Sequence, residues 1–172
     1  MDSTHIHLFL NHAPVAGVAF GLFFLTMGFL RRSETMRLSA ITLFTLSSLL
    51  VLPVFFTGEA AEETAEGLPG VSESVIESHE DAAKVAIWGM VLLGVASIGT
   101  LTYAAKKRAL PMPLVGLVAV LAVTSMGLIG RTAYLGGQIR HTELHGAAQG
   151  GQGSQEGSQD GGENEGERSG DD

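Results

Sequence analysis

The chain has 172 residues, 45% of them hydrophobic, and a formal net charge of -8. Its apolar residues are gathered into a few long runs, a pattern typical of membrane proteins and not of one soluble domain, so we expect the lipid bilayer as its partner and no nucleic acid. It contains no cysteine, which excludes disulfides, thiolate metal sites, cysteine-ligated iron–sulfur clusters and the attachment of c-type haem.

Four of the apolar runs are long enough to cross a bilayer as helices. They cover residues of about 13–30, 38–56, 85–105 and 114–135. Even a run of 18 helical residues spans about 27 Å of a hydrocarbon core that is roughly 30 Å thick. Trp88 and Tyr103 lie near the two ends of the third run, where amphipathic rings are preferred. The sequence therefore predicts an all-α integral membrane protein, an antiparallel four-helix bundle formed by residues 1–146.

The short connections between the runs predict the orientation. Six of the ten basic residues lie in the connections between runs one and two and between runs three and four: Arg31, Arg32, Arg37, Lys106, Lys107 and Arg108. By the positive-inside rule these connections are cytoplasmic, and both termini and the 57–84 connection are outside. We therefore predict the inner membrane of a bacterium, with both termini facing the periplasm or the exterior.

The last residues have a different composition from the rest. From Gly146 to Asp172 there is no aromatic residue and no aliphatic residue larger than alanine, while seven acidic residues accompany the single Arg168. Such a segment has too little apolar surface to offset its ordering entropy. We expect residues 147–172 to form a disordered acidic tail rich in Gly, Ser and Gln.

The 57–84 connection carries two acidic stripes at helical spacing, around a turn at 67–70. The first comprises Glu59, Glu62, Glu63 and Glu66; the second comprises Glu73, Glu77 and Glu80. Glu80 and Lys84 have the i,i+4 spacing of a helical ion pair. One interpretation is a solvated helix face. The other is that Glu59, nearest the membrane, supplies a carboxylate to a binding site.

The histidines all map to the outer ends of the helices or just beyond them: His5, His7, His12, His79, His141 and His145. Only one shallow site near the outer surface is therefore available, whereas a di-haem cytochrome needs ligands at two depths. No Asp, Glu, His, Lys or Arg lies in the middle of the runs. This argues against a transporter or pump.

His79 is predicted to point into the bundle, because its helical neighbours include the small residues Ala82, Ala83 and Ala86. Such a face leaves room for a flat cofactor or for close helix packing. His12 stands in the first turn of the first helix, with Asn11 as the predicted N-cap.

The fourth helix ends in a polar stripe at alternating three- and four-residue steps, provided that Gly136-Gly137 does not break the helix. The stripe comprises Arg131, Tyr134, Gln138, His141 and His145. Arg131 lies one turn from the end of its run and is expected to snorkel or to pair with an anion.

Short motifs in the order His-x-Pro, Thr-Gly, His and Gly-Gly resemble those of a bacterial family of predicted four-helix membrane proteins, the domain-of-unknown-function family numbered twenty-two thirty-one. In this chain they are His7-Leu8-Phe9-Leu10-Asn11-His12-Ala13-Pro14, Thr57-Gly58, His79 and Gly136-Gly137-Gln138-Ile139-Arg140-His141. The chain departs from the pattern after Thr-Gly and after Gly-Gly, which indicates a distinct subgroup. That family has no established activity, so the resemblance implies the fold and the importance of His12 and His79 without naming a reaction.

These features favour a small membrane redox or metal-binding module over an enzyme, with no catalytic residue and at most an electron-transfer role. The predicted ligands of one b-type haem or one transition metal are His12, His79 and His141. Glu59 is a further ligand for a metal, and Arg131 or Arg140 pairs with haem propionates. Its partner would be a membrane or periplasmic redox protein. The alternative is a non-catalytic scaffold or accessory subunit whose outer polar cluster ties the helices together.

Overall fold

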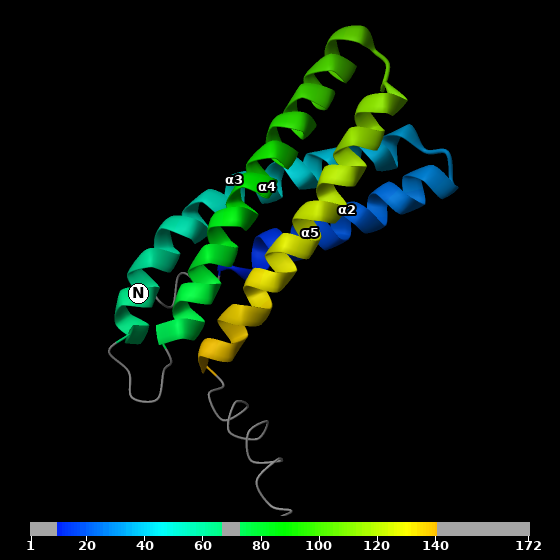
Figure 1. The fold of residues 1–172 in the computed structure, drawn as a ribbon. Coiled ribbons are helices and arrows are strands. Elements are labelled where there is room, and N and C mark those ends of the chain that lie inside the picture. Colours follow the sequence, from blue (N-terminus) through cyan, green and yellow to red (C-terminus); the bar gives the residue numbers. More distant parts are fainter. Residues whose placement is uncertain (1–9, 67–72, 141–172) are drawn as a thin grey trace, which may run out of the picture. The chain divides into compact units, whose positions relative to one another are not determined.

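The computed structural model describes residues 10–66 and 73–140 (Figure 1). They form four helices: α2 His12–Leu30, α3 Glu34–Glu66, α4 Glu73–Lys107 and α5 Met112–Arg140. All four are long and apolar enough to cross a membrane, and no strand occurs in the described ranges. The predicted all-α class is therefore confirmed, as are four helices long and apolar enough to cross a membrane. The predicted tail at 147–172 lies outside the described residues.

The second and third helices are longer than the apolar runs from which they were predicted. α3 continues through Pro53 to Glu66, and α4 already begins at Glu73. Both extensions carry the acidic stripes, whose helical spacing predicted them. The turn expected at 67–70 lies outside the described residues.

The connection between α2 and α3 is a tight turn. Ser33 N donates to Gly28 O at 3.0 Å and Arg32 N to Phe29 O at 3.2 Å, the two bonds of a Schellman motif. Arg32 has φ 53°, a left-handed conformation that glycine usually adopts. Ser33 then caps α3, because its Oγ accepts a hydrogen bond from Met36 N at 3.3 Å.

The connection between α4 and α5 is built in a similar way. Arg108 has φ 54°, and Pro111 O accepts a hydrogen bond from Val115 N at 3.1 Å in the first turn of α5. At this level one side chain links the α2–α3 pair to the α4–α5 pair, since Arg37 Nη1 of α3 donates a hydrogen bond to Met112 Sδ of α5 at 2.9 Å. We call the end of the helices that carries both connections the basic end and the opposite end the outer end.

Small residues bring the helices into close contact. A Cβ added at Gly17 of α2 would collide with the Ser47 hydroxyl of α3, and one added at Gly94 of α4 would lie 2.8 Å from Ser48 Cβ of α3. In a bilayer, helices associate through such close packing because lipid tails are as apolar as the side chains.

The outward surface of the helices is apolar, as contact with lipid requires. The buried core is formed by aliphatic and aromatic residues from all four helices, including Val18, Phe44, Met90 and Val118. Trp88 is 69% exposed and Tyr103 is 44% exposed. The two rings are 15 residues apart on α4, a rise of about 22 Å, so they lie on the surface near the two ends of the hydrophobic segment, as predicted.

Candidate functional site

His79 lies on the inward face of the outer part of α4. Ala82 and Ala86 on the same face are buried, whereas Glu77 and Asp81 are exposed on the other side. The inward orientation predicted from the alanines is confirmed.

An ion pair lies on the outside of the same helix turn. Glu80 Oε1 and Lys84 Nζ are 2.7 Å apart, as their i,i+4 spacing predicted. Both side chains are about half exposed, so water screens the pair and it contributes little to stability.

The His79 ring joins α4 to α5. Its Nδ1 lies 3.0 Å from the backbone carbonyl oxygen of Thr132. A carbonyl only accepts hydrogen bonds, so Nδ1 must carry the proton and donate it. In the neutral ring this fixes Nε2 as the nitrogen with the lone pair.

Gly136 of α5 makes room for this ring. A Cβ added there would lie 2.9 Å from His79 Cε1 and 3.2 Å from Nδ1, both closer than ordinary contact. The neighbouring Gly137 has open space around it. The Gly-Gly pair does not break α5, which continues to Arg140. Of the two glycines only Gly136 packs against the imidazole, and we call this contact the seat of His79.

His12 lies at a different depth from His79. It is the first residue of α2 and is exposed, while Asn11 occupies the N-cap position without a side-chain capping bond. The contacts of Gly17 with Ser47 and of Ser48 with Gly94 place Gly17 roughly level with Gly94 of α4. His12 is five residues outward from Gly17 along α2, whereas His79 is fifteen residues outward from Gly94 along α4. At 1.5 Å per residue, His79 is about 15 Å farther along α4 from this level than His12 is along α2.

The described residues therefore do not bring His12 and His79 to one level. α2 begins part way along the longer α3 and α4 (Figure 1). The prediction that His79 converges with at least one of His12 and His141 on a common centre stays a prediction, because His141 lies outside the described residues.

The other predicted ligands are placed only in part. Arg131 is exposed on α5, one residue before the carbonyl that His79 contacts. Glu59 belongs to α3 and Arg140 to α5, but their side chains, like the whole of His141, lie outside what the structure describes. Within the described residues no three His, Asp or Glu side chains are grouped closely enough to hold a metal ion.

The bundle interior contains hydroxyl groups in place of charges. Ser48, Ser97 and Ser125 are buried, and their Oγ atoms have no hydrogen-bond partner among the described residues. Buried Thr100 instead donates to Ala96 O one turn earlier at 2.7 Å, a bond that a rotated serine can also make. Two of these small polar residues lie at close helix contacts, since Ser48 faces Gly94 and Ser125 faces Gly89.

Thr132 and Gly136 are the partners of His79 that sequence reasoning missed. The Gly-Gly pair was the available signal, since a glycine in a helix at the level of an inward ring indicates close approach. No family model, curated protein or solved structure matches the chain.

Proposed function

We propose that this protein is a non-catalytic membrane scaffold or accessory subunit, an antiparallel four-helix bundle whose outer polar residues hold the helices together. The observation that carries the proposal is the hydrogen bond from His79 to the Thr132 carbonyl. The inward histidine of the outer region is used to attach α4 to α5, and it sits on a glycine that fits its ring. Such a bond between helices contributes about 0.5–1.5 kcal/mol.

One observation favours the second candidate, a redox or metal-binding module. Ligating histidines usually donate one ring N–H to a carbonyl or carboxylate, which orients the other nitrogen toward the metal. The His79 bond has this form. A b-type haem or a transition metal would then need further ligands from His141 and Glu59, with Arg131 or Arg140 near haem propionates. His12 does not fit this set because it lies deeper in the bundle than His79.

Two substitutions of His79 distinguish the candidates. Asparagine keeps an N–H donor at the position of Nδ1, since both nitrogens are bonded to Cγ, but it has no counterpart of Nε2. Leucine has neither. If His79 is a helix link, His79→Leu should lower the free energy of unfolding in detergent by about 1 kcal/mol and His79→Asn by much less.

The cofactor itself provides the second measurement. An absorption spectrum and a metal analysis of the purified full chain should show no Soret band and no stoichiometric metal. A Soret band or one metal per chain that both His79→Asn and His79→Leu abolish would overturn the scaffold proposal in favour of the redox module.

We further propose that the basic end is cytoplasmic and that both termini face the periplasm of a bacterial inner membrane. The charges of the two short connections support this orientation. The resemblance to the domain-of-unknown-function family, to which we assign the chain as a proposal, supports the four-helix membrane fold. Compartment-sensitive reporters fused after Arg32, after Lys107 and at Asp172 should report inside, inside and outside. An outside signal at Lys107 would contradict the four-span topology.

A further inference from the structure

The side chain of Arg37 lies across the basic end of the bundle and contacts two neighbouring helices. It passes over Gly28 of α2, where an added Cβ would lie 2.7 Å from Arg37 Cγ. Its Nη1 then reaches Met112 Sδ of α5 at 2.9 Å, and its Nε donates to Ser33 O at 3.3 Å. These contacts hold the guanidinium group in a defined place, unlike a side chain that extends freely into solvent.

The contacts of this guanidinium group leave its charge without a counter-ion. Its two acceptors, a backbone carbonyl and a thioether, are neutral, and a thioether accepts only weakly. Glu34, three residues earlier, is the only acidic residue at the basic end. No ion pair joins Glu34 to Arg37 within residues 10–66 and 73–140. A partly buried positive charge therefore lies among neutral groups and other cations.

The positive ends of two helix dipoles add to this charge. Arg37 belongs to the first turn of α3, which begins at Glu34, and Met112 is the first residue of α5. Anions are favoured at helix N-termini and cations at helix C-termini. A guanidinium group beside two N-termini is therefore in an unfavourable position, and an anion bound to it would make the arrangement favourable.

The level of Arg37 indicates the source of such an anion. Arg37 directly precedes the apolar run at 38–56, and Met112 precedes the run at 114–135 by two residues. At 1.5 Å per residue, both lie within about 3 Å of the end of an apolar run. The polar headgroups of a bilayer lie just beyond its hydrocarbon core. The phosphate group of a lipid is therefore the anion that Arg37 meets at this level.

We propose that the basic end binds the phosphate of an anionic phospholipid of the phosphatidylglycerol class, with Arg37 as the central ligand. The planar guanidinium group donates parallel hydrogen bonds to phosphate oxygens. Arg32 and Arg108, in the two connections of the same end, have exposed side chains that add attraction at longer range. A zwitterionic lipid carries a cationic group beside its phosphate, and these positive charges repel that group. The proposal requires insertion in a membrane but is independent of the role of His79.

Lipid retention by the full chain tests the proposal. The protein is reconstituted in nanodiscs with equal parts of phosphatidylglycerol and phosphatidylcholine, extracted in mild detergent, and its bound lipids are counted by native mass spectrometry. We expect phosphatidylglycerol to exceed phosphatidylcholine by about fivefold, the factor typical of one basic residue close to anionic lipid. Arg37→Gln should remove most of this preference, because glutamine is polar but carries no charge.

Lys106→Gln is the matched control, because it removes the same charge from an exposed side chain of the same end. It should leave most of the preference intact, since an exposed charge is hydrated and screened by salt. Equal losses in Arg37→Gln and Lys106→Gln would overturn the proposal, because the preference would then come from the net charge of the basic end. Equal retention of the two lipids by the natural protein would overturn it as well.

A second measurement uses the natural protein alone and does not depend on the folding of a variant. Phosphatidylglycerol added to the protein in detergent should raise the midpoint of thermal unfolding more than the same concentration of phosphatidylcholine does. Inorganic phosphate at that concentration should not match this rise, because it lacks the acyl chains that hold a lipid phosphate at the level of Arg37. An equal rise with inorganic phosphate would overturn the lipid proposal in favour of a soluble anion.

Discussion

Replacement of Gly21 by leucine is expected to lower the free energy of unfolding by about 1–3 kcal/mol. Gly21 of α2 packs against the ring of Phe44 of α3, which is completely buried. A Cβ at position 21 would collide with Phe44 Cε1 and lie 2.7 Å from Cδ1. The ring is enclosed by the core and has no space into which to move, so the two helices must separate or the ring must leave its rotamer. Loss of helical circular dichroism on titration with denaturing detergent measures the effect.

A second glycine provides the control for this substitution. Gly116 of α5 has no atom within 4 Å of an added Cβ, so Gly116→Leu should be neutral or stabilising, because leucine favours a helix more than glycine does. Combining Gly21→Leu with Phe44→Ala should cost less than the sum of the two single changes, since the cavity accepts the new side chain. Equal losses in Gly21→Leu and Gly116→Leu would show that α2 and α3 are not packed as described.

The positions of the membrane helices were predictable because the bilayer imposes a length and a composition on each one. The apolar run at 13–30 corresponds to α2 His12–Leu30 with little difference. The run at 85–105 missed the first turns of α4, which begins at Glu73. Those turns lie beyond the apolar segment, where only the spacing of Glu73, Glu77 and Glu80 indicates a helix.

Only those features of the candidate site that depend on a single helix were predicted from the sequence. The inward direction of His79 follows from its own helix, where Ala82 and Ala86 mark the packed face. Its partner is a backbone carbonyl, which every residue has, so no side chain in the sequence identifies Thr132. The depth of His12 depends on the register between helices. That register is set by contacts such as that of Gly17 with Ser47, and a hydropathy pattern does not contain them.

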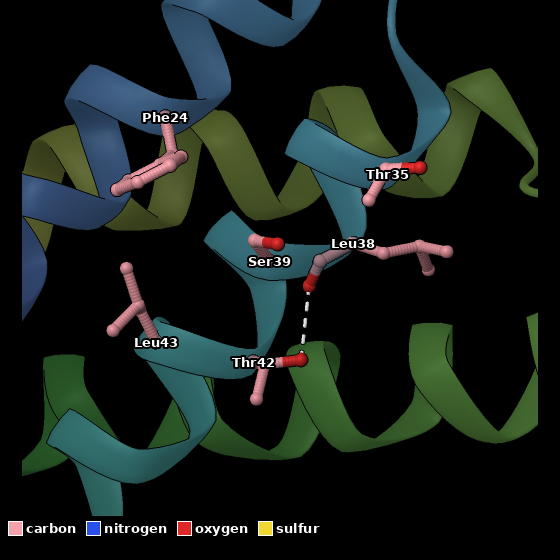
Figure 2. Close-up of a pocket in the computed structure, with 6 residues that line it drawn as sticks. All are labelled: Phe24, Thr35, Leu38, Ser39, Thr42 and Leu43. Carbon is pink, nitrogen blue, oxygen red and sulfur yellow. Dashed lines mark hydrogen bonds between the residues drawn. The ribbon is translucent and has the colours of Figure 1, made fainter.

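A groove between α2 and α3, lined in part by a stripe of hydroxyl-bearing residues, was beyond sequence reasoning for a similar reason. Thr35, Ser39 and Thr42 form a stripe that helical periodicity alone reveals. Whether such a stripe faces another helix or the lipid depends on which neighbours α3 has on each side. Only the packed structure shows that Phe24 of α2 forms the other part of the groove (Figure 2).

Replacement of Gly136 by leucine should separate the outer ends of α4 and α5, with a loss of about 1–3 kcal/mol in the free energy of unfolding. An added Cβ would already lie 2.9 Å from His79 Cε1, and the remaining side-chain atoms need still more space. The ring cannot rotate away without breaking its hydrogen bond to Thr132 O. The donor then loses its acceptor in a partly buried position, which adds to the cost of the collision. Amide hydrogen exchange of the outer turns of α4 and α5 should increase, while exchange near the basic end stays unchanged.

The adjacent glycine is a matched control for this substitution, because Gly137 lies on the same turn and has open space around it. Gly137→Leu should be neutral or stabilising, since leucine has the higher helix propensity. The combination of Gly136→Leu with His79→Ala tests the cause of the loss. If the ring is the obstacle, removing it should recover the part of the loss that comes from the collision, and the double substitution should then cost less than the sum of the single ones. Additive losses would mean that Gly136 is required for another reason, and the seat of His79 on α5 would no longer explain how the outer ends of the two helices are held together.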